Sequence, residues 1–296
     1  MAGGSNGVTR REIDERHGSA GALGASRGLG GHVGAPQYTE RFVPLRDGAV
    51  TLRVLSAGHG APLVYFHSFH EPEPWSPFLD RLAERFTVYA PVHPGAPGSS
   101  GVETLDGVHD LTLVYDELFD ALGVATPHLV GHGFGGMAAA ETAAVFRRRP
   151  AKLVLVSPLG LWLDKTPNAD LLILPVEELL TTLWADPNSA AAKAWASAPD
   201  ADPDNVPALA ASLQRRSAMA KFVWPIPDKG LAKRLHRIVA PTLLLWGERD
   251  RANPLVYAEE WQRRVKGAAL RLLPGGHMVI HERPDAAAAA VMEFLT

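Results

Sequence analysis

Short apolar runs alternate with amphipathic segments along most of this chain. Strand-like runs at 62–67, 86–91, 127–131, 152–157, 241–246 and 269–273 are continuous in apolar residues, as expected of strands covered on both faces. Segments with helical periodicity lie between them, at about 76–85, 108–122, 135–147, 255–265 and 284–295. Two further short strands, 41–46 and 49–56, flank a turn at Asp47-Gly48 that is typical of a hairpin. The pattern predicts a mostly parallel sheet with helices on both faces.

The alternation stops at about residue 160 and resumes near 241. The residues between them favour helices at 175–185, 190–198 and 206–219, broken by Pro and Asp. We interpret 160–237 as a helical lid inserted over the carboxyl edge of the sheet, where α/β proteins bind ligands. Residues 1–36 are rich in Gly, Ala, Ser and Arg and carry few large apolar side chains, so we expect a disordered tail. Residues 37–296 then form one domain.

Composition excludes several classes of function. The chain has no cysteine, which excludes disulfides, thiolate catalysis and cysteine-bound zinc. Its net charge of −3 gives no basic field for nucleic acid or an anionic membrane. Its apolar runs are shorter than the roughly 20 residues that span a bilayer. We therefore expect a cytoplasmic protein, monomeric or homodimeric, with no nucleic-acid or membrane partner.

Four polar segments follow predicted strands, at the edge where ligands bind. They are Tyr65-Phe66-His67-Ser68-Phe69-His70, Val130-Gly131-His132-Gly133-Phe134-Gly135-Gly136, Trp246-Gly247-Glu248-Arg249-Asp250 and Pro274-Gly275-Gly276-His277. In this order they resemble the motifs of the α/β-hydrolase superfamily, particularly its lid-bearing esterases, epoxide hydrolases and carbon–carbon bond hydrolases. The resemblance covers about residues 40–296. It implies an α/β-hydrolase fold in which an acid, Asp250, and then a histidine, His277, follow the nucleophile elbow.

The elbow departs from the family pattern G-x-S-x-G, because Gly133 stands at the serine position. Glycine has no side chain, so no covalent intermediate can form there. The resemblance further implies that the backbone N–H groups of Phe134 and Phe69 stabilise an oxyanion. The family usually has His-Gly where this chain has His67-Ser68, which changes the surroundings of the second donor.

Three hypotheses fit this elbow. In the preferred one, a non-covalent, serine-independent hydrolase or lyase uses His277 as base and Asp250 as its orienter, and water or a substrate group fills the vacated space. In the second, a ligand-binding pseudoenzyme retains the motifs as inherited packing. In the third, a serine hydrolase was inactivated by a natural or engineered change of serine to glycine.

Other polar residues near the motifs are weaker candidates. Ser68 is the best stand-in for the missing hydroxyl, unless it only binds substrate. His67 and His132 occupy positions where the family commonly has histidine for structural reasons. Together with His70 and His93 they show no recognised ligand spacing, so we expect no metal and no cofactor.

The predicted lid is rich in large apolar side chains, some of which should line a pocket for a small apolar or aromatic substrate. We expect Trp162 and Trp224 among the residues that contact it, and Phe222–Pro227 as one wall. The apolar lid residues are Leu161, Trp162, Leu163, Leu171, Leu172, Leu180, Trp184, Phe222 and Trp224.

Overall fold

The computed structural model describes residues 38–71, 75–199, 202, 204–224 and 228–296. The tail predicted at 1–36 lies outside these residues, as do Pro225, Ile226 and Pro227 of the predicted pocket wall. None of the described helices combines the length and the apolar character that crossing a membrane requires.

An eight-stranded sheet forms the centre of residues 38–296. Its strands are β1 (Thr39–Leu45), β2 (Val50–Ala57), β3 (Ala61–Phe66), β4 (Phe86–Pro91), β5 (His128–His132), β6 (Leu153–Val156), β7 (Thr242–Gly247) and β8 (Ala269–Leu273). They lie in the order β1-β2-β4-β3-β5-β6-β7-β8. The hairpin β1–β2 is antiparallel, β2 runs antiparallel to β4, and every other pair is parallel. The predicted α/β-hydrolase architecture is confirmed.

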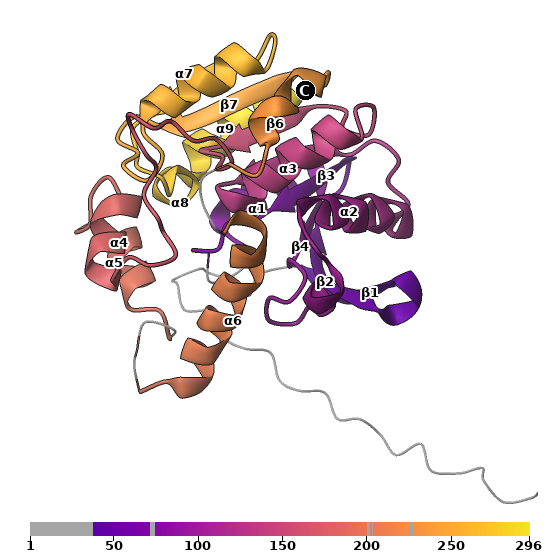
Figure 1. Cartoon of the computed structure of the whole chain (residues 1–296), viewed down its shortest axis with the longest axis horizontal. Helices are drawn as coiled ribbons and strands as arrows, with labels where there is room; N and C mark the ends of the chain where they lie inside the picture. Colours follow the sequence, from indigo (N-terminus) through magenta and orange to yellow (C-terminus); the bar gives the residue numbers. More distant parts are fainter. Residues whose placement is uncertain (1–37, 72–74, 200–201, 203, 225–227) are drawn as a thin grey trace, which may run out of the picture. The chain divides into compact units, whose positions relative to one another are not determined.

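Helices cover the sheet, and most of them lie where the periodicity predicts (Figure 1). Their bounds are α1 (Pro77–Ala83), α2 (Val108–Leu122), α3 (Phe134–Val145), α4 (Val176–Leu183), α5 (Ala190–Ala196), α6 (Val206–Val223), α7 (Leu255–Arg264), α8 (Val279–Glu282) and α9 (Pro284–Leu295). Short 3₁₀ turns occupy Arg46–Gly48, Val102–Thr104, Leu231–Lys233 and Leu235–Arg237. The one-turn helix α8 was not predicted, because four residues are too few to display a helical period.

Alternate side chains of each central strand enter two different cores. In β3, Val64 and Phe66 join the cluster that contains residues of α2, α3 and α7. Leu63 and Tyr65 point to the other face and join residues of α1, α8 and α9. This period of two, with both faces buried, explains why the strand reads as an uninterrupted apolar run.

The connection from β6 to β7 contains α4, α5 and α6, at the position of the predicted insertion. Its segments contact loops that follow the strands: Nε2 of His70 donates to the carbonyl of Leu171 (3.0 Å), and the indole N–H of Trp195 donates to the carbonyl of His70 (2.9 Å). The amide of Met278 donates to the carbonyl of Leu183 (3.0 Å). The insertion therefore packs on the loops at the carboxyl edge.

An ion pair fastens the end of this connection to α3. The guanidinium of Arg234 binds both carboxylate oxygens of Glu141, at 2.7 and 2.6 Å. The Glu141 side chain is 1% exposed and that of Arg234 is 22% exposed. Removal of the cation alone would leave a buried carboxylate without its counter-charge.

We predict that Arg234→Met lowers the free energy of unfolding by about 3 kcal/mol, because a broken buried pair is costly. Urea denaturation measures the loss. The double variant Arg234→Met/Glu141→Leu should recover most of it, and Arg148→Met, at an exposed position, is the matched control. A loss in Arg234→Met no larger than in the control would contradict the prediction.

Candidate active site

The turn between β5 and α3 is built around Gly133. Its backbone has φ +53° and ψ −113°, a conformation that L residues with a side chain rarely adopt. Its N–H donates to the carbonyl of Val156 (3.0 Å), and its own carbonyl accepts from the amides of Met137 (3.1 Å) and Leu159 (3.0 Å). These bonds fix the elbow without any side chain at 133.

Gly135 shows how closely the elbow packs against the neighbouring strand. A Cβ atom on Gly135 would lie 1.9 Å from the carbonyl oxygen of Phe66, the last residue of β3. Only glycine allows α3 to begin this close to β3. The first residues of α3 therefore sit beside the loop that follows β3.

His277 and Asp250 come together from the loops after β8 and β7. Nδ1 of His277 lies 3.0 Å from Oδ2 of Asp250, and both side chains are buried. The other carboxylate oxygen accepts from the amide of Asn253 (2.8 Å). Because a carboxylate only accepts hydrogen bonds, Nδ1 carries the hydrogen and Nε2 offers its lone pair.

The free nitrogen of His277 faces the elbow. A Cβ atom built on Gly133 would lie 3.3 Å from Nε2 of His277. Within the described part of the chain, Nε2 is buried and has no hydrogen-bond partner. The structure thus places the lone pair of the base where a nucleophile from the elbow would meet it.

The two residues predicted to supply oxyanion donors lie next to each other. The rings of Phe69 and Phe134 have centroids 6.1 Å apart. Phe134 is the first residue of α3, so its N–H belongs to the first turn, where helices lack internal acceptors. The carbonyl of Phe69 accepts a hydrogen bond from Nε of Arg215 (3.3 Å).

Ser68 borders the space left by the missing elbow side chain. Its Oγ would lie 2.6 Å from a Cβ atom on Gly133, closer than real Cβ contacts allow. The residue is 1% exposed, and its hydroxyl has no hydrogen-bond partner among the described residues. The vacated space is therefore partly occupied by the protein's own hydroxyl group.

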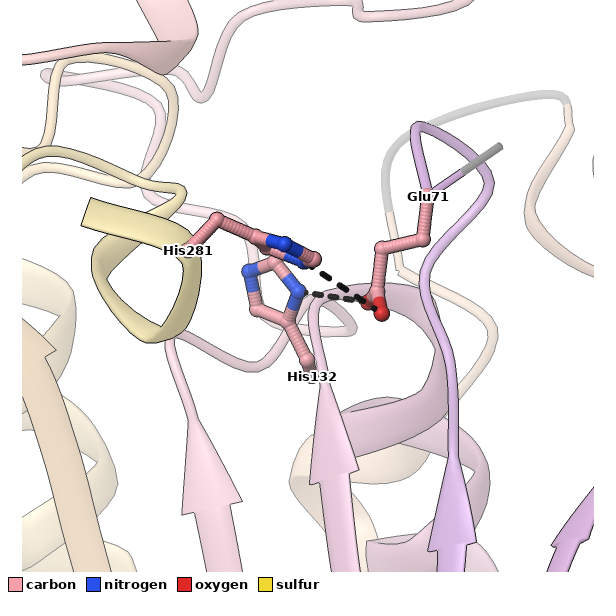
Figure 2. Close-up of side chains that lie close together, drawn as sticks. All are labelled: Glu71, His132 and His281. Carbon is pink, nitrogen blue, oxygen red and sulfur yellow. Dashed lines mark hydrogen bonds and ion pairs between the residues drawn. The ribbon is translucent and has the colours of Figure 1, made fainter. Parts of the chain in front are cut away.

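Glu71, in the loop after β3, connects this loop to β5 and α8. It was not among the site residues predicted from the sequence. Figure 2 shows Glu71, His132 of β5 and His281 of α8 pointing toward one another. The Glu71 carboxylate accepts from the Ser68 amide (2.7 Å), the Tyr65 hydroxyl (2.8 Å) and Nδ1 of His132 (2.7 Å), and Nε2 of His281 lies 3.5 Å away. An acidic residue in a loop gives no sequence signal of such burial, which only the folded chain creates.

The hydrogen bonds of His132 and Glu71 fix the donor role of His132 and the direction of the pKa shift of Glu71. Nε2 of His132 must donate to the carbonyl of His277 (3.0 Å), because a carbonyl only accepts. Nδ1 of His132 faces the carboxylate of Glu71 at 2.7 Å. Burial raises the pKa of Glu71, but hydrogen bonds from His132 and His281 outweigh it and hold that pKa well below 4.5.

The same three side chains have the residue types of a metal site. Tetrahedral zinc with ligands at about 2.1 Å places its donor atoms about 3.4 Å apart. The 2.7 Å separation of Nδ1 of His132 from Glu71 instead suits a shared proton.

The remaining loop histidines are neutral and structural. Burial lowers the pKa of His70 to about 3 and also lowers that of His67. Nδ1 of His67 donates to the carbonyl of Ser68 (3.0 Å), and Nε2 of His93 donates to the carbonyl of His67 (2.9 Å). These bonds shape the loop after β3.

An apolar pocket opens beside Phe69. The structure places the predicted lid residues Leu161, Leu171 and Leu172 in its wall, but not the predicted contacts Trp162 and Trp224. Trp224 is 47% exposed, and the indole of Trp162 donates to Asp164 (3.0 Å). The full lining is Phe69, Met137, Leu159, Gly160, Leu161, Asn168, Ala169, Asp170, Leu171, Leu172, Val223, Lys229 and Leu231.

Comparison with known proteins agrees with this geometry. The profile of the family described as "Alpha/beta hydrolase family" matches residues 54–290. This chain belongs to the alpha/beta hydrolase family.

Curated relatives align with most of this chain. A 2-hydroxy-6-oxononadienedioate/2-hydroxy-6-oxononatrienedioate hydrolase of Comamonas testosteroni is 26% identical over 280 residues, covering 87% of this chain and 96% of the relative. A 2-hydroxy-6-oxo-6-phenylhexa-2,4-dienoate hydrolase of Burkholderia cepacia is 26% identical over 281 residues, with the same coverage. Both act on small organic molecules, as their names state.

A solved structure supports the fold assignment. The 2-hydroxy-6-oxo-6-phenylhexa-2,4-dienoate hydrolase of Rhodococcus sp. strain RHA1 superposes with a TM-score of 0.68 at 22% identity. The match covers 88% of this chain and 99% of that protein. At this level of identity the likeness shows the alpha/beta hydrolase fold alone.

We predict that the Glu71 cluster makes this hydrolase-family fold sensitive to acid. A carboxyl group with a lowered folded-state pKa stabilises the fold above pH 4.5, and this contribution is lost as pH falls toward the folded-state value. Glu71→Gln should remove that contribution, so its stability deficit relative to wild type should shrink as pH drops below 4.5.

Urea denaturation between about pH 7 and pH 3 measures the difference between the two proteins. Glu84→Gln, at an exposed glutamate, controls for the loss of one surface charge. A deficit for Glu71→Gln that stays constant over the whole range would show that this carboxylate has an ordinary pKa.

Proposed function

We propose that this chain is a hydrolase of a small, largely apolar carbonyl compound, in which His277 is the general base. The observation that carries the proposal is the pair His277–Asp250, whose buried 3.0 Å hydrogen bond leaves Nε2 free beside the elbow. Asp250 orients the imidazole and stabilises the imidazolium that forms during the reaction. The reaction is non-covalent at residue 133, because glycine offers no nucleophile.

The attacking group in this proposal is a water molecule. His277 takes a proton from the water as its oxygen attacks the carbonyl carbon of the substrate. The negative charge that develops on the carbonyl oxygen is stabilised by the N–H groups of Phe69 and Phe134. A lyase-like cleavage would use the same base on a substrate proton instead.

The pocket beside Phe69 supports an apolar substrate group. Its wall is formed mainly by side chains of the connection between β6 and β7, with Asp170 and Lys229 as its charged members, and α3 contributes Met137. We propose that the insertion acts as the lid of this pocket. The two relatives hydrolyse 2-hydroxy-6-oxo-dienoate or related compounds, which makes carbon–carbon bond cleavage a reaction to test beside ester hydrolysis.

The two other hypotheses make different claims about His277. A ligand-binding pseudoenzyme would retain ligand affinity and show no turnover to lose when His277 is replaced. A serine hydrolase that merely lost its nucleophile would have an empty place at the elbow, whereas Ser68 reaches into that place. This contact favours the enzyme with a rearranged site.

We predict that His277→Ala lowers kcat/KM about 10³-fold or more and that Asp250→Asn lowers it about 10²-fold or more, because general-base catalysis depends on both side chains. Hydrolysis of p-nitrophenyl acetate and of 2-hydroxy-6-oxo-6-phenylhexa-2,4-dienoate provides the measurement. His236→Ala, at an exposed histidine, is the control. Turnover of both compounds that is unchanged in His277→Ala would refute the proposed function.

A second prediction concerns restoring serine at the elbow. In Gly133→Ser the new Cβ atom would collide with Oγ of Ser68, so the single variant should gain little esterase activity. The double variant Gly133→Ser/Ser68→Gly removes the obstacle. We expect it to hydrolyse p-nitrophenyl acetate about 10-fold faster or more than the single variant, with a burst of an acyl-enzyme.

Ser68→Gly alone controls for the change in the loop. Equal activity of the single and double variants would show that Ser68 does not obstruct residue 133. Absence of any burst in the double variant would contradict oxyanion stabilisation by Phe69 and Phe134.

A further inference from the structure

Two buried polar atoms flank one point in the site and have no partner of their own. They are Oγ of Ser68 and Nε2 of His277, and neither forms a hydrogen bond within the described ranges. A Cβ atom on Gly133 would lie 2.6 Å from the first and 3.3 Å from the second. Both atoms therefore face the place where the side chain of an elbow residue would stand.

The two atoms are not hydrogen-bonded to each other. A serine activated directly by a histidine requires a contact of about 2.6–3.2 Å between oxygen and nitrogen. No such bond joins Ser68 and His277 in the described structure. Buried polar groups rarely remain without a partner, and a water molecule needs two to four polar neighbours. This pair of atoms therefore has the chemistry of a water site.

The backbone on both sides of Ser68 is fixed. Its amide donates to Glu71 (2.7 Å), and its carbonyl accepts from Nδ1 of His67 (3.0 Å). Glu71 is in turn held by His132, which also donates to the backbone of His277 (3.0 Å). One buried network thus holds the loop of Ser68 and the loop of His277 in a constant relation.

The absence of a side chain at Gly133 leaves room for the hydroxyl group of Ser68. Any side chain at 133 would begin with a Cβ atom 2.6 Å from Oγ of Ser68 in its present rotamer. Glycine also accepts the positive φ of +53° without strain. Glycine at 133 therefore allows Ser68 to keep its hydroxyl group close to Nε2 of His277.

We propose that Ser68 is a catalytic residue that positions the attacking water against Nε2 of His277, beside Gly133. This inference rests on the proposed function. The water oxygen forms the new bond to the carbonyl carbon, one water proton passes to Nε2, and the other stays hydrogen-bonded to Oγ of Ser68. The carbonyl π electrons move to the oxygen, and collapse of the adduct returns the proton from Nε2 to the leaving group.

Replacement of Ser68 by alanine is the direct test. A lost hydrogen bond of about 1.5–3 kcal/mol predicts a fall in kcat of about 10- to 100-fold for p-nitrophenyl acetate, with little change in KM. Ser76→Ala is the matched control, because its hydroxyl is also buried and without a partner in the described residues. An unchanged kcat in Ser68→Ala, or an effect confined to KM, overturns the inference.

Two further readouts separate water positioning from other roles. Crystal structures should show a water within hydrogen-bond distance of both Oγ and Nε2 in the wild type and its loss in Ser68→Ala; a wild type without it overturns the inference. Treatment with diisopropyl fluorophosphate should leave Ser68 unmodified by mass spectrometry. An adduct on Ser68 would show that the hydroxyl itself attacks, which also overturns it.

The outcomes distinguish this inference from the proposed function. If His277→Ala abolishes turnover while Ser68→Ala matches the wild type, the hydrolase proposal stands and the role of Ser68 is refuted. If His277→Ala matches the wild type, both fail together.

Discussion

The hydrogen bond between His277 and Asp250 determines what the site can do. It places the hydrogen on Nδ1 and thereby leaves a lone pair on Nε2, the nitrogen that faces the elbow. Burial of both side chains protects the bond from competition with water. Without this constraint either nitrogen could carry the hydrogen, and the remaining features would surround a histidine of undefined function.

A buried hydrogen-bond network gives the site its rigidity. Glu71 and His132 link the loop after β3 to the end of β5, and His132 reaches the backbone of His277 after β8. The loop after β3, the end of β5 and the loop after β8 are therefore connected through Glu71 and His132. Removal of one partner would leave the other buried without a hydrogen bond, so the network specifies one arrangement of the loops.

Much of this architecture is readable from the sequence because it depends on local periodicity. The strand at 62–67 and the helix at 108–122 were predicted nearly to the residue. Each apolar pattern fits only one type of secondary structure. The convergence of His277 and Gly133 follows from the rule that parallel strands end at one edge. The burial of Glu71 and the exposure of Trp224 depend on contacts between distant segments, and no local pattern encodes them.

The relation between Ser68 and Gly133 bears on how the site acquired its present form. A simple loss of the elbow serine would change one residue and leave its neighbours as they were. Here the loop opposite the elbow carries a hydroxyl whose Oγ would lie 2.6 Å from a Cβ atom at 133, so a side chain there would require Ser68 to change its rotamer. Because a Cβ atom at 133 and the present position of the Ser68 hydroxyl conflict, the two positions are considered together. A hydroxyl beside an oriented base is the arrangement that the proposed activation of water requires.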